Sequence, residues 1–131
     1  MKKSYKGFIL WIVLFMAGFF PIMLIKTNAG LLTRITMNYT SMMLAFLAYI
    51  IYKYDRIYWY NGVDFEEAAE AGRERRDAYT VAHLKKFIKF AGFYALFSFI
   101  MHLAGKGIWI DSIVFTLGLI CTAVSTIRIK L

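Results

Sequence analysis

The chain has 131 residues, of which 60% are hydrophobic and 18% aromatic, with a formal net charge of +8 and a mean hydropathy of +0.57. Ordinary soluble domains are closer to half apolar, and the excess here is concentrated in long blocks, which argues against a soluble enzyme domain. The single cysteine, Cys121, excludes an intrachain disulfide and a Cys-x-x-Cys redox pair.

Four apolar blocks approach the roughly 20 residues that a membrane span requires. They cover residues 7–25, 31–52, 87–104 and 108–127. The connections at 26–30 and 105–107 are short, and short connections join antiparallel neighbours. We therefore predict an all-α integral membrane protein, with residues 1–131 forming one transmembrane domain folded as an antiparallel up-down four-helix bundle.

The first block follows the basic segment "MKKSYK" and so has some features of a secretory signal peptide. The segment "TNA" before Gly30 also offers small residues at a cleavage-like position. The apolar stretch is long, however, and we expect it to be retained as the first membrane span.

A helical cytoplasmic loop, residues 53–86, is predicted between the second and third spans. Its first aromatic residues, Tyr58 to Tyr60, suit the level of the lipid headgroups, and the Asn-Gly pair at 61–62 is typical of a turn. Asp64 and Glu67 have the spacing of a capping box at the start of a short helix, which Gly72 would end. The segment after Gly72 is expected to run helically into the third span.

The charges of this loop nearly cancel, because it holds seven of the eight acidic residues and a similar number of basic ones. A surface for nucleic acid or anionic lipid would need one sign to dominate. Two interpretations remain open: a solvated helical loop with pairs such as Glu70–Arg73 and Arg73–Asp77, or a docking surface for a protein partner. The docking candidates are Glu66, Glu67, Glu70, Arg73, Arg75 and Arg76.

The orientation follows from the basic residues. With the N-terminus in the cytoplasm, thirteen of the 16 lysines and arginines lie on the cytoplasmic side. This positive-inside bias places both termini in the cytoplasm and predicts a multi-pass protein of the plasma (inner) membrane. The lipid bilayer is the expected partner, nucleic acid is not, and assembly into a homo-oligomer is left open.

Small and polar residues recur along one face of three spans, and such residues favour contacts between helices in lipid. The three series are Arg34, Asn38, Ser41, Ala45 and Ala48; Ala91, Ala95, Ser98 and His102; and Asp111, Gly118, Thr122 and Ser125. Each series has one ionisable residue near its extracellular end. We expect these three residues to meet inside the bundle at a similar depth.

The helix dipoles predict a specific partner for Arg34. Asp111 lies in the first turn of its helix, where the dipole favours an acid, whereas Arg34 near the start of its helix is opposed by the dipole. Asp111 is also the only acidic residue outside the cytoplasmic loop. We predict an Arg34–Asp111 ion pair with Asn38 beneath it and His102 beside it. The cluster is either a structural pair or a site for a ligand, ion or proton.

Signatures of catalysis are missing from the sequence. The spans hold no pair of carboxylates, no nucleophile–base arrangement and no phosphate-binding motif. His83 and His102 would lie on opposite sides of the bilayer, so they cannot share a metal ion. We therefore expect no catalytic residues, no metal site and no cofactor.

Two classes of function remain. The first is a noncatalytic binding, accessory, regulatory or immunity-type membrane protein with an outward-facing polar cluster. The alternative is a subunit of an oligomeric small-solute or ion transporter or channel that uses this cluster. The polar series of the second span ends at Ser41, near mid-membrane, and this favours the first class.

Overall fold

The computed structural model describes residues 3–60 and 63–131, and the regular secondary structure of these residues is entirely helical. The elements are α1 (Lys6–Ala17), α2 (Phe19–Met23), α3 (Ala29–Tyr54), the 3-10 helix η1 (Ile57–Trp59), α4 (Phe65–Ala71), α5 (Arg73–Leu103) and α6 (Ile108–Ile127). Four helical stretches are long and apolar enough to cross a membrane: α1 with α2, α3, α5 and α6. The prediction of an all-helical chain with four such helices is confirmed.

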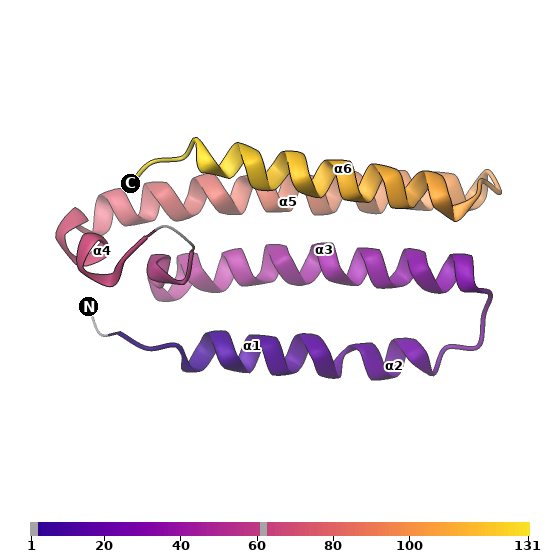
Figure 1. Cartoon of the computed structure of the whole chain (residues 1–131), viewed down its shortest axis with the longest axis horizontal. Helices are drawn as coiled ribbons and strands as arrows, with labels where there is room; N and C mark the ends of the chain where they lie inside the picture. The colour runs from indigo at the N-terminus through magenta and orange to yellow at the C-terminus, as the bar shows by residue number, and fades with distance from the viewer. Residues whose placement is uncertain (1–2, 61–62) are drawn as a thin grey trace.

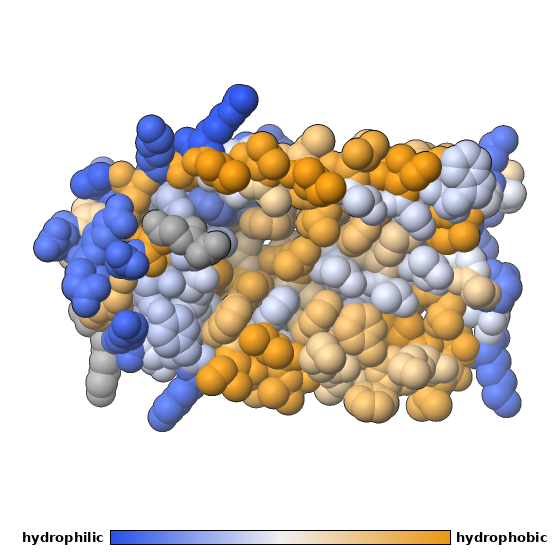
Figure 2. All heavy atoms as spheres, viewed as in Figure 1, coloured by the Kyte–Doolittle hydropathy of each residue, from blue (hydrophilic) through white to orange (hydrophobic). Residues whose placement is uncertain are grey.

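The long helices lie side by side, and the chain reverses direction at each connection (Figure 1). Helix α3 is central: it packs closely on α5, contacts α6, and carries α1 and α2 on its other side. Helices α1 and α2 therefore rest mainly on α3. Space-filling spheres show an apolar band along the middle of the molecule and hydrophilic residues at both ends (Figure 2).

The first predicted span is two helices, broken at Gly18. Pro21 has no N–H and leaves the carbonyl four residues earlier without its helical partner, which favours a break at this point. The Tyr39 hydroxyl donates to the Phe15 carbonyl at 2.8 Å. A Cβ at Gly18 would overlap the Tyr39 ring and hydroxyl, so only glycine allows this close approach.

Aromatic rings attach α1 to α3. Trp11 stacks on Phe15 at 5.3 Å between ring centroids, and Phe15 stacks on Tyr39 at 5.6 Å. The Trp11 indole Nε1 donates to the Met43 carbonyl at 3.0 Å, which links the two helices by a hydrogen bond as well. Stacked rings and an indole hydrogen bond, rather than charges, hold this helix pair together.

Helix α3 begins at the N-cap residue Asn28, which lies in the segment "TNA" that resembles a signal-peptide cleavage site. The Asn28 side chain accepts a hydrogen bond from the Leu31 N–H at 2.8 Å, which satisfies one of the free donors of the first turn. At the other end Asp55 adopts the left-handed conformation, with φ of 56°. The structure thus has defined start and stop residues for this helix.

Helix α4 occupies the predicted position, from its N-cap residue Asp64 to Gly72. The Asp64 side chain makes no capping hydrogen bond, so the predicted capping box is wrong. Gly72 has φ of 83°, a conformation that glycine adopts without strain, and it lets α5 start immediately. The turn predicted at residues 61–62 lies outside the described residues.

Helix α5 has 31 residues and is therefore about 46 Å long. The hydrocarbon core of a bilayer is roughly 30 Å thick, so α5 is longer than a span requires. The helix begins at Arg73, well before the third apolar block, which starts at residue 87. The second half of the predicted loop is therefore the N-terminal part of α5.

A small apolar core closes the end of the molecule at which α4 lies. It contains Ile51, Ile57, Val63, Ala68 and Tyr79, with residues of the C-terminal segment packed against it. The core joins the end of α3, the helices η1 and α4, and the start of α5. It gives the connecting segment a fixed structure rather than that of an extended loop.

Candidate functional site

Arg34 and Asp111 form a bidentate ion pair. The Arg34 Nε donates to Asp111 Oδ2 at 3.0 Å, and its Nη2 donates to Oδ1 at 3.2 Å. Arg34 is 6% exposed and Asp111 is completely buried. The pair predicted from the helix dipoles is present in the structure, and charge-assisted bidentate geometry is the strongest form of such a contact.

A third hydrogen bond extends this pair to the connection between α5 and α6. The Arg34 Nη2 also donates to the Lys106 carbonyl at 2.6 Å. One guanidinium thus links α3 to α6 and to the segment before it. The two opposite charges are matched within the protein, and this arrangement fixes the relative position of the helices.

Asn38 lies one turn further along α3, as predicted. Its Nδ2 donates to the Arg34 carbonyl at 2.9 Å and to the Ser98 hydroxyl at 3.1 Å. The Asn38 Oδ1 is buried and has no hydrogen-bond partner in the described part of the chain. Both carboxylate oxygens of Asp111 accept from Arg34, whereas the buried hydroxyl of Tyr94 also has no partner among the described residues.

The position of His102 differs from the prediction. Its side chain is exposed, and within the described residues it makes no hydrogen bond to Arg34, Asn38 or Asp111. His102 follows Ser98 by four residues, and this step turns its side chain by about 40° around the helix axis. In addition, the Arg34 Nη2 already donates to the Lys106 carbonyl. His102 therefore does not belong to the buried cluster.

Sequence reasoning missed Tyr94, which is fully buried on the same face of α5. Its ring contacts Phe115 of α6 edge to face, at 5.2 Å between centroids. The signal was available, because Tyr94 follows Ala91 by three residues and precedes Ser98 by four. A search for small residues alone passes over an aromatic that fills the same interior position.

A second buried pair was not predicted. Arg76 donates to both carboxylate oxygens of Asp55, at 2.9 and 3.0 Å, and to the Ala68 carbonyl at 3.0 Å. The side chains of Arg76 and Asp55 are only 11% and 16% exposed. Arg76 thus links α3, α4 and α5, and its docking role stays a prediction.

The other docking candidates remain at the surface: Glu66, Glu67, Glu70, Arg73 and Arg75 are exposed. The predicted Arg73–Asp77 pair is present at 3.8 Å with both side chains largely in solvent. The predicted Glu70–Arg73 pair does not occur among the ion pairs of the described residues. Arg75 donates to the Leu131 carbonyl at 2.5 Å, so it also ties down the C-terminal segment.

An aromatic cavity of about 530 Å³ lies beside this end of α5. Tyr60 stacks on His83 at 4.2 Å between ring centroids, and Tyr79 lies 4.4 Å from the same ring. Burial, with a smaller contribution from Tyr79, raises the pKa of Tyr60 far above its usual value, so its phenol stays protonated. The walls of the cavity are therefore uncharged at neutral pH on the Tyr60 side.

The described residues contain no group of three or more His, Cys, Asp or Glu side chains that could hold a metal ion. Comparison of the chain with protein-family models, with curated proteins and with solved structures gave no match.

Proposed function

We propose that the chain is a multi-pass protein of the plasma (inner) membrane that acts noncatalytically, as a binding, accessory, regulatory or immunity-type protein. The apolar band between two hydrophilic ends supports insertion of the four long helices as an antiparallel bundle. The thirteen basic residues that the sequence assigns to the same side of the membrane support cytoplasmic termini. The α4 end of the molecule then faces the cytoplasm.

The proposal rests on the contrast between charged residues that are paired within the protein and charged residues that are exposed. The two buried arginines, Arg34 and Arg76, are each matched by an aspartate of the same chain. Such pairs fix the register of helices without needing a ligand. The acids of α4 are left exposed beside Arg73 and Arg75, and we propose that these acids contact the partner.

Helix α4 is held in place while its acidic face stays open. Its Ala68 is completely buried, and the Ala68 carbonyl accepts from Arg76, which also binds Asp55. A surface fixed in advance loses less conformational entropy when it binds. The exposed carboxylates Glu66, Glu67 and Glu70 suit a basic segment of a protein partner in the cytoplasm.

The test is co-purification of a stoichiometric partner from host membranes. The variant Glu66→Lys/Glu67→Lys/Glu70→Lys should lose this partner, because the charge of the surface is reversed. The matched control Lys26→Glu/Lys106→Glu changes charges at the other end of the molecule and should keep it. Equal recovery of the partner by both variants, or no partner with the wild-type chain, would contradict the proposal.

A transport role is the second candidate, supported by the unsatisfied Asn38 Oδ1 beside the ion pair. The polar column stops soon below it: the Ser41 hydroxyl donates to the Asn38 carbonyl of its own helix, and Ala48 is buried further along α3. Proteoliposomes with the purified chain are therefore expected to show no ion or proton flux above empty liposomes. Flux that Arg34→Gln or Asp111→Asn abolishes, with helicity retained, would establish transport instead.

A further inference from the structure

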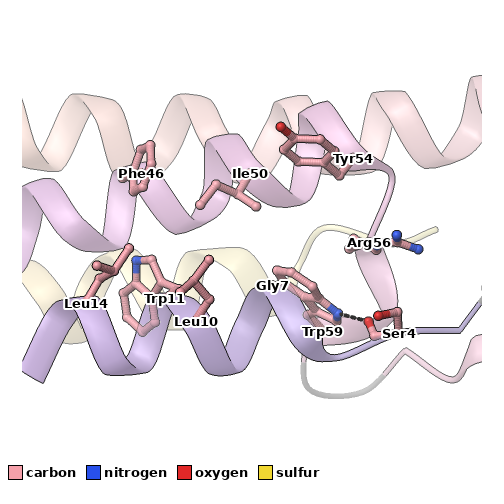
Figure 3. Close-up of a pocket in the computed structure, with 10 residues that line it drawn as sticks. All are labelled: Ser4, Gly7, Leu10, Trp11, Leu14, Phe46, Ile50, Tyr54, Arg56 and Trp59. Atoms are coloured by element: carbon pink, nitrogen blue, oxygen red, sulfur yellow. Dashed lines mark hydrogen bonds between the residues drawn. The ribbon is translucent and has the colours of Figure 1, made fainter.

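A groove separates α1 from α3 on the side away from α5 and α6 (Figure 3). Its volume is about 380 Å³, within the range of roughly 300–1,000 Å³ that is usual for small-molecule sites. It is lined by Ser4, Gly7, Leu10, Trp11, Leu14, Phe46, Ile50, Tyr54, Arg56 and Trp59. None of these residues belongs to the two ion pairs or to the aromatic cavity described above.

The groove is apolar over most of its length. Leu10 of α1 and Phe46 of α3 are 59% and 46% exposed, and the Trp11 indole is fixed on the floor by its hydrogen bond to Met43. The axial distance from Phe46 to Tyr54 is about 12 Å. One leaflet contributes about 15 Å of hydrocarbon, so the groove matches part of one acyl chain.

One end of the groove is polar. The Trp59 indole donates to the Ser4 carbonyl at 2.9 Å, which holds the N-terminal segment over this end (Figure 3). A Cβ at Gly7 would lie 2.9 Å from the Trp59 ring, so glycine lets the ring rest against α1. Tyr54 and Trp59 have the amphipathic rings that are typical of the headgroup level.

The polar end carries positive charge. Among the described residues that line the groove, Arg56 is the only charged one, and none is acidic. The neighbouring Asp55 does not cancel this charge, because Arg76 holds it in the second buried pair. Lys53 adds another cation nearby, with its Nζ 5.7 Å from the ring centre of Tyr54.

We propose that this groove binds an anionic phospholipid of the cytoplasmic leaflet. One acyl chain lies between α1 and α3, and the phosphate lies at the Arg56 guanidinium, a group suited to phosphate oxygens. The inference uses the membrane orientation of the proposed function but does not depend on a protein partner. The near-neutral charge of the whole loop does not oppose it, since the local charge at the groove is positive.

Tryptophan fluorescence tests the proposal, because two of the three tryptophans, Trp11 and Trp59, line the groove. The full chain carrying Trp109→Phe is reconstituted in phosphatidylcholine nanodiscs with a small fixed fraction of lipid with brominated acyl chains. Brominated phosphatidylglycerol should quench the emission more than brominated phosphatidylcholine at the same fraction. Equal quenching by the two lipids would overturn the proposal.

Substitutions locate the headgroup. Arg56→Gln should lower the preference for phosphatidylglycerol about fivefold, the effect of one cation near an anionic lipid. Lys130→Gln removes a charge at the same end of the molecule but outside the groove and should leave the preference unchanged. Equal losses in both variants would indicate general surface charge and overturn the site. Arg56→Lys, which keeps the charge, should retain the preference and gives a readout even where Arg56→Gln fails to fold.

Discussion

Two buried arginine–aspartate pairs hold α3 at opposite ends. Arg34–Asp111 joins the start of α3 to α6, and Arg76–Asp55 joins the end of α3 to α5. Arg34 binds the two Asp111 oxygens through Nε and Nη2, whereas Arg76 binds both Asp55 oxygens through Nε alone. In both pairs the arginine also donates to a backbone carbonyl. An arginine–aspartate ion pair therefore fixes the central helix α3 at each end.

The surroundings of the two pairs differ. The side chains of Arg34 and Asp111 are 7% and 0% exposed, whereas those of Arg76 and Asp55 are 11% and 16% exposed. Solvent therefore reaches the carboxylate of Asp55 but not that of Asp111. The comparison teaches that arginine–aspartate pairs of similar closest distance have a different energetic weight according to the access of water.

The largest effect is expected from Asp111→Asn, which leaves the Arg34 charge buried without an anion. The free energy of unfolding should fall by about 3–5 kcal/mol, the cost of breaking a buried pair. Chemical denaturation in detergent, followed by circular dichroism, measures it. The double variant Arg34→Met/Asp111→Leu removes both charges and should recover most of the loss. A double variant as unstable as the single one would show that the charges are not the cause.

A smaller effect is expected from Asp55→Asn. Asparagine also tolerates the left-handed conformation of this residue, so the substitution tests the charge and not the backbone. The loss should be about 1–3 kcal/mol, since hydrogen bonds to a charged group are broken at a partly hydrated site. High salt should reduce this loss but not that of Asp111→Asn, because screening acts where water reaches. Equal salt dependence of the two variants would remove the distinction drawn between the pairs.

Helices α1 and α2 depend on neither pair, and Gly18→Ala tests their own attachment. The added methyl group would collide with Tyr39, and overpacking of this kind costs about 1–3 kcal/mol. Hydrogen exchange should show the loss in α1 and α2 while α3, α5 and α6 keep their protection. The control Gly92→Ala has open space at its Cβ and should not destabilise the chain.

The smallest effect is expected from Asp77→Asn, which breaks the exposed Arg73–Asp77 pair. Exposed pairs on one helix contribute about 0.3–0.5 kcal/mol. The same denaturation experiment should find almost no change. A loss as large as that of Asp55→Asn would mean that exposure does not govern the strength of these pairs.

The Arg34–Asp111 pair could be predicted from the sequence, whereas the Arg76–Asp55 pair could not. Arg34 interrupts an apolar block, and only one acid lies outside the loop, so the choice of partner was limited. Arg76 lies among seven acids and several bases, and helical spacing alone permits many pairings. The contacts of Arg76 with Asp55 and with the Ala68 carbonyl depend on how α3, α4 and α5 pack.

His102 and Tyr94 show a second limit. Both fit the periodic face of α5, but that face is buried only where α3 and α6 cover it. Tyr94 is fully buried, whereas His102, eight residues further along α5, is exposed. The periodicity of a helix indicates which residues share a face, and its neighbours decide how much of that face is buried.

The sequence by itself determined the four apolar helices, the end of α4 at Gly72 and the pairing of Arg34 with Asp111, because hydropathy, backbone conformation and an intramembrane charge each allow few solutions. Only the tertiary structure decided that Arg76 binds Asp55, that Gly18 receives Tyr39, and that a groove with Arg56 at its end opens between α1 and α3. These features bring together residues far apart in the chain, and their contacts depend on how the helices pack rather than on any local pattern.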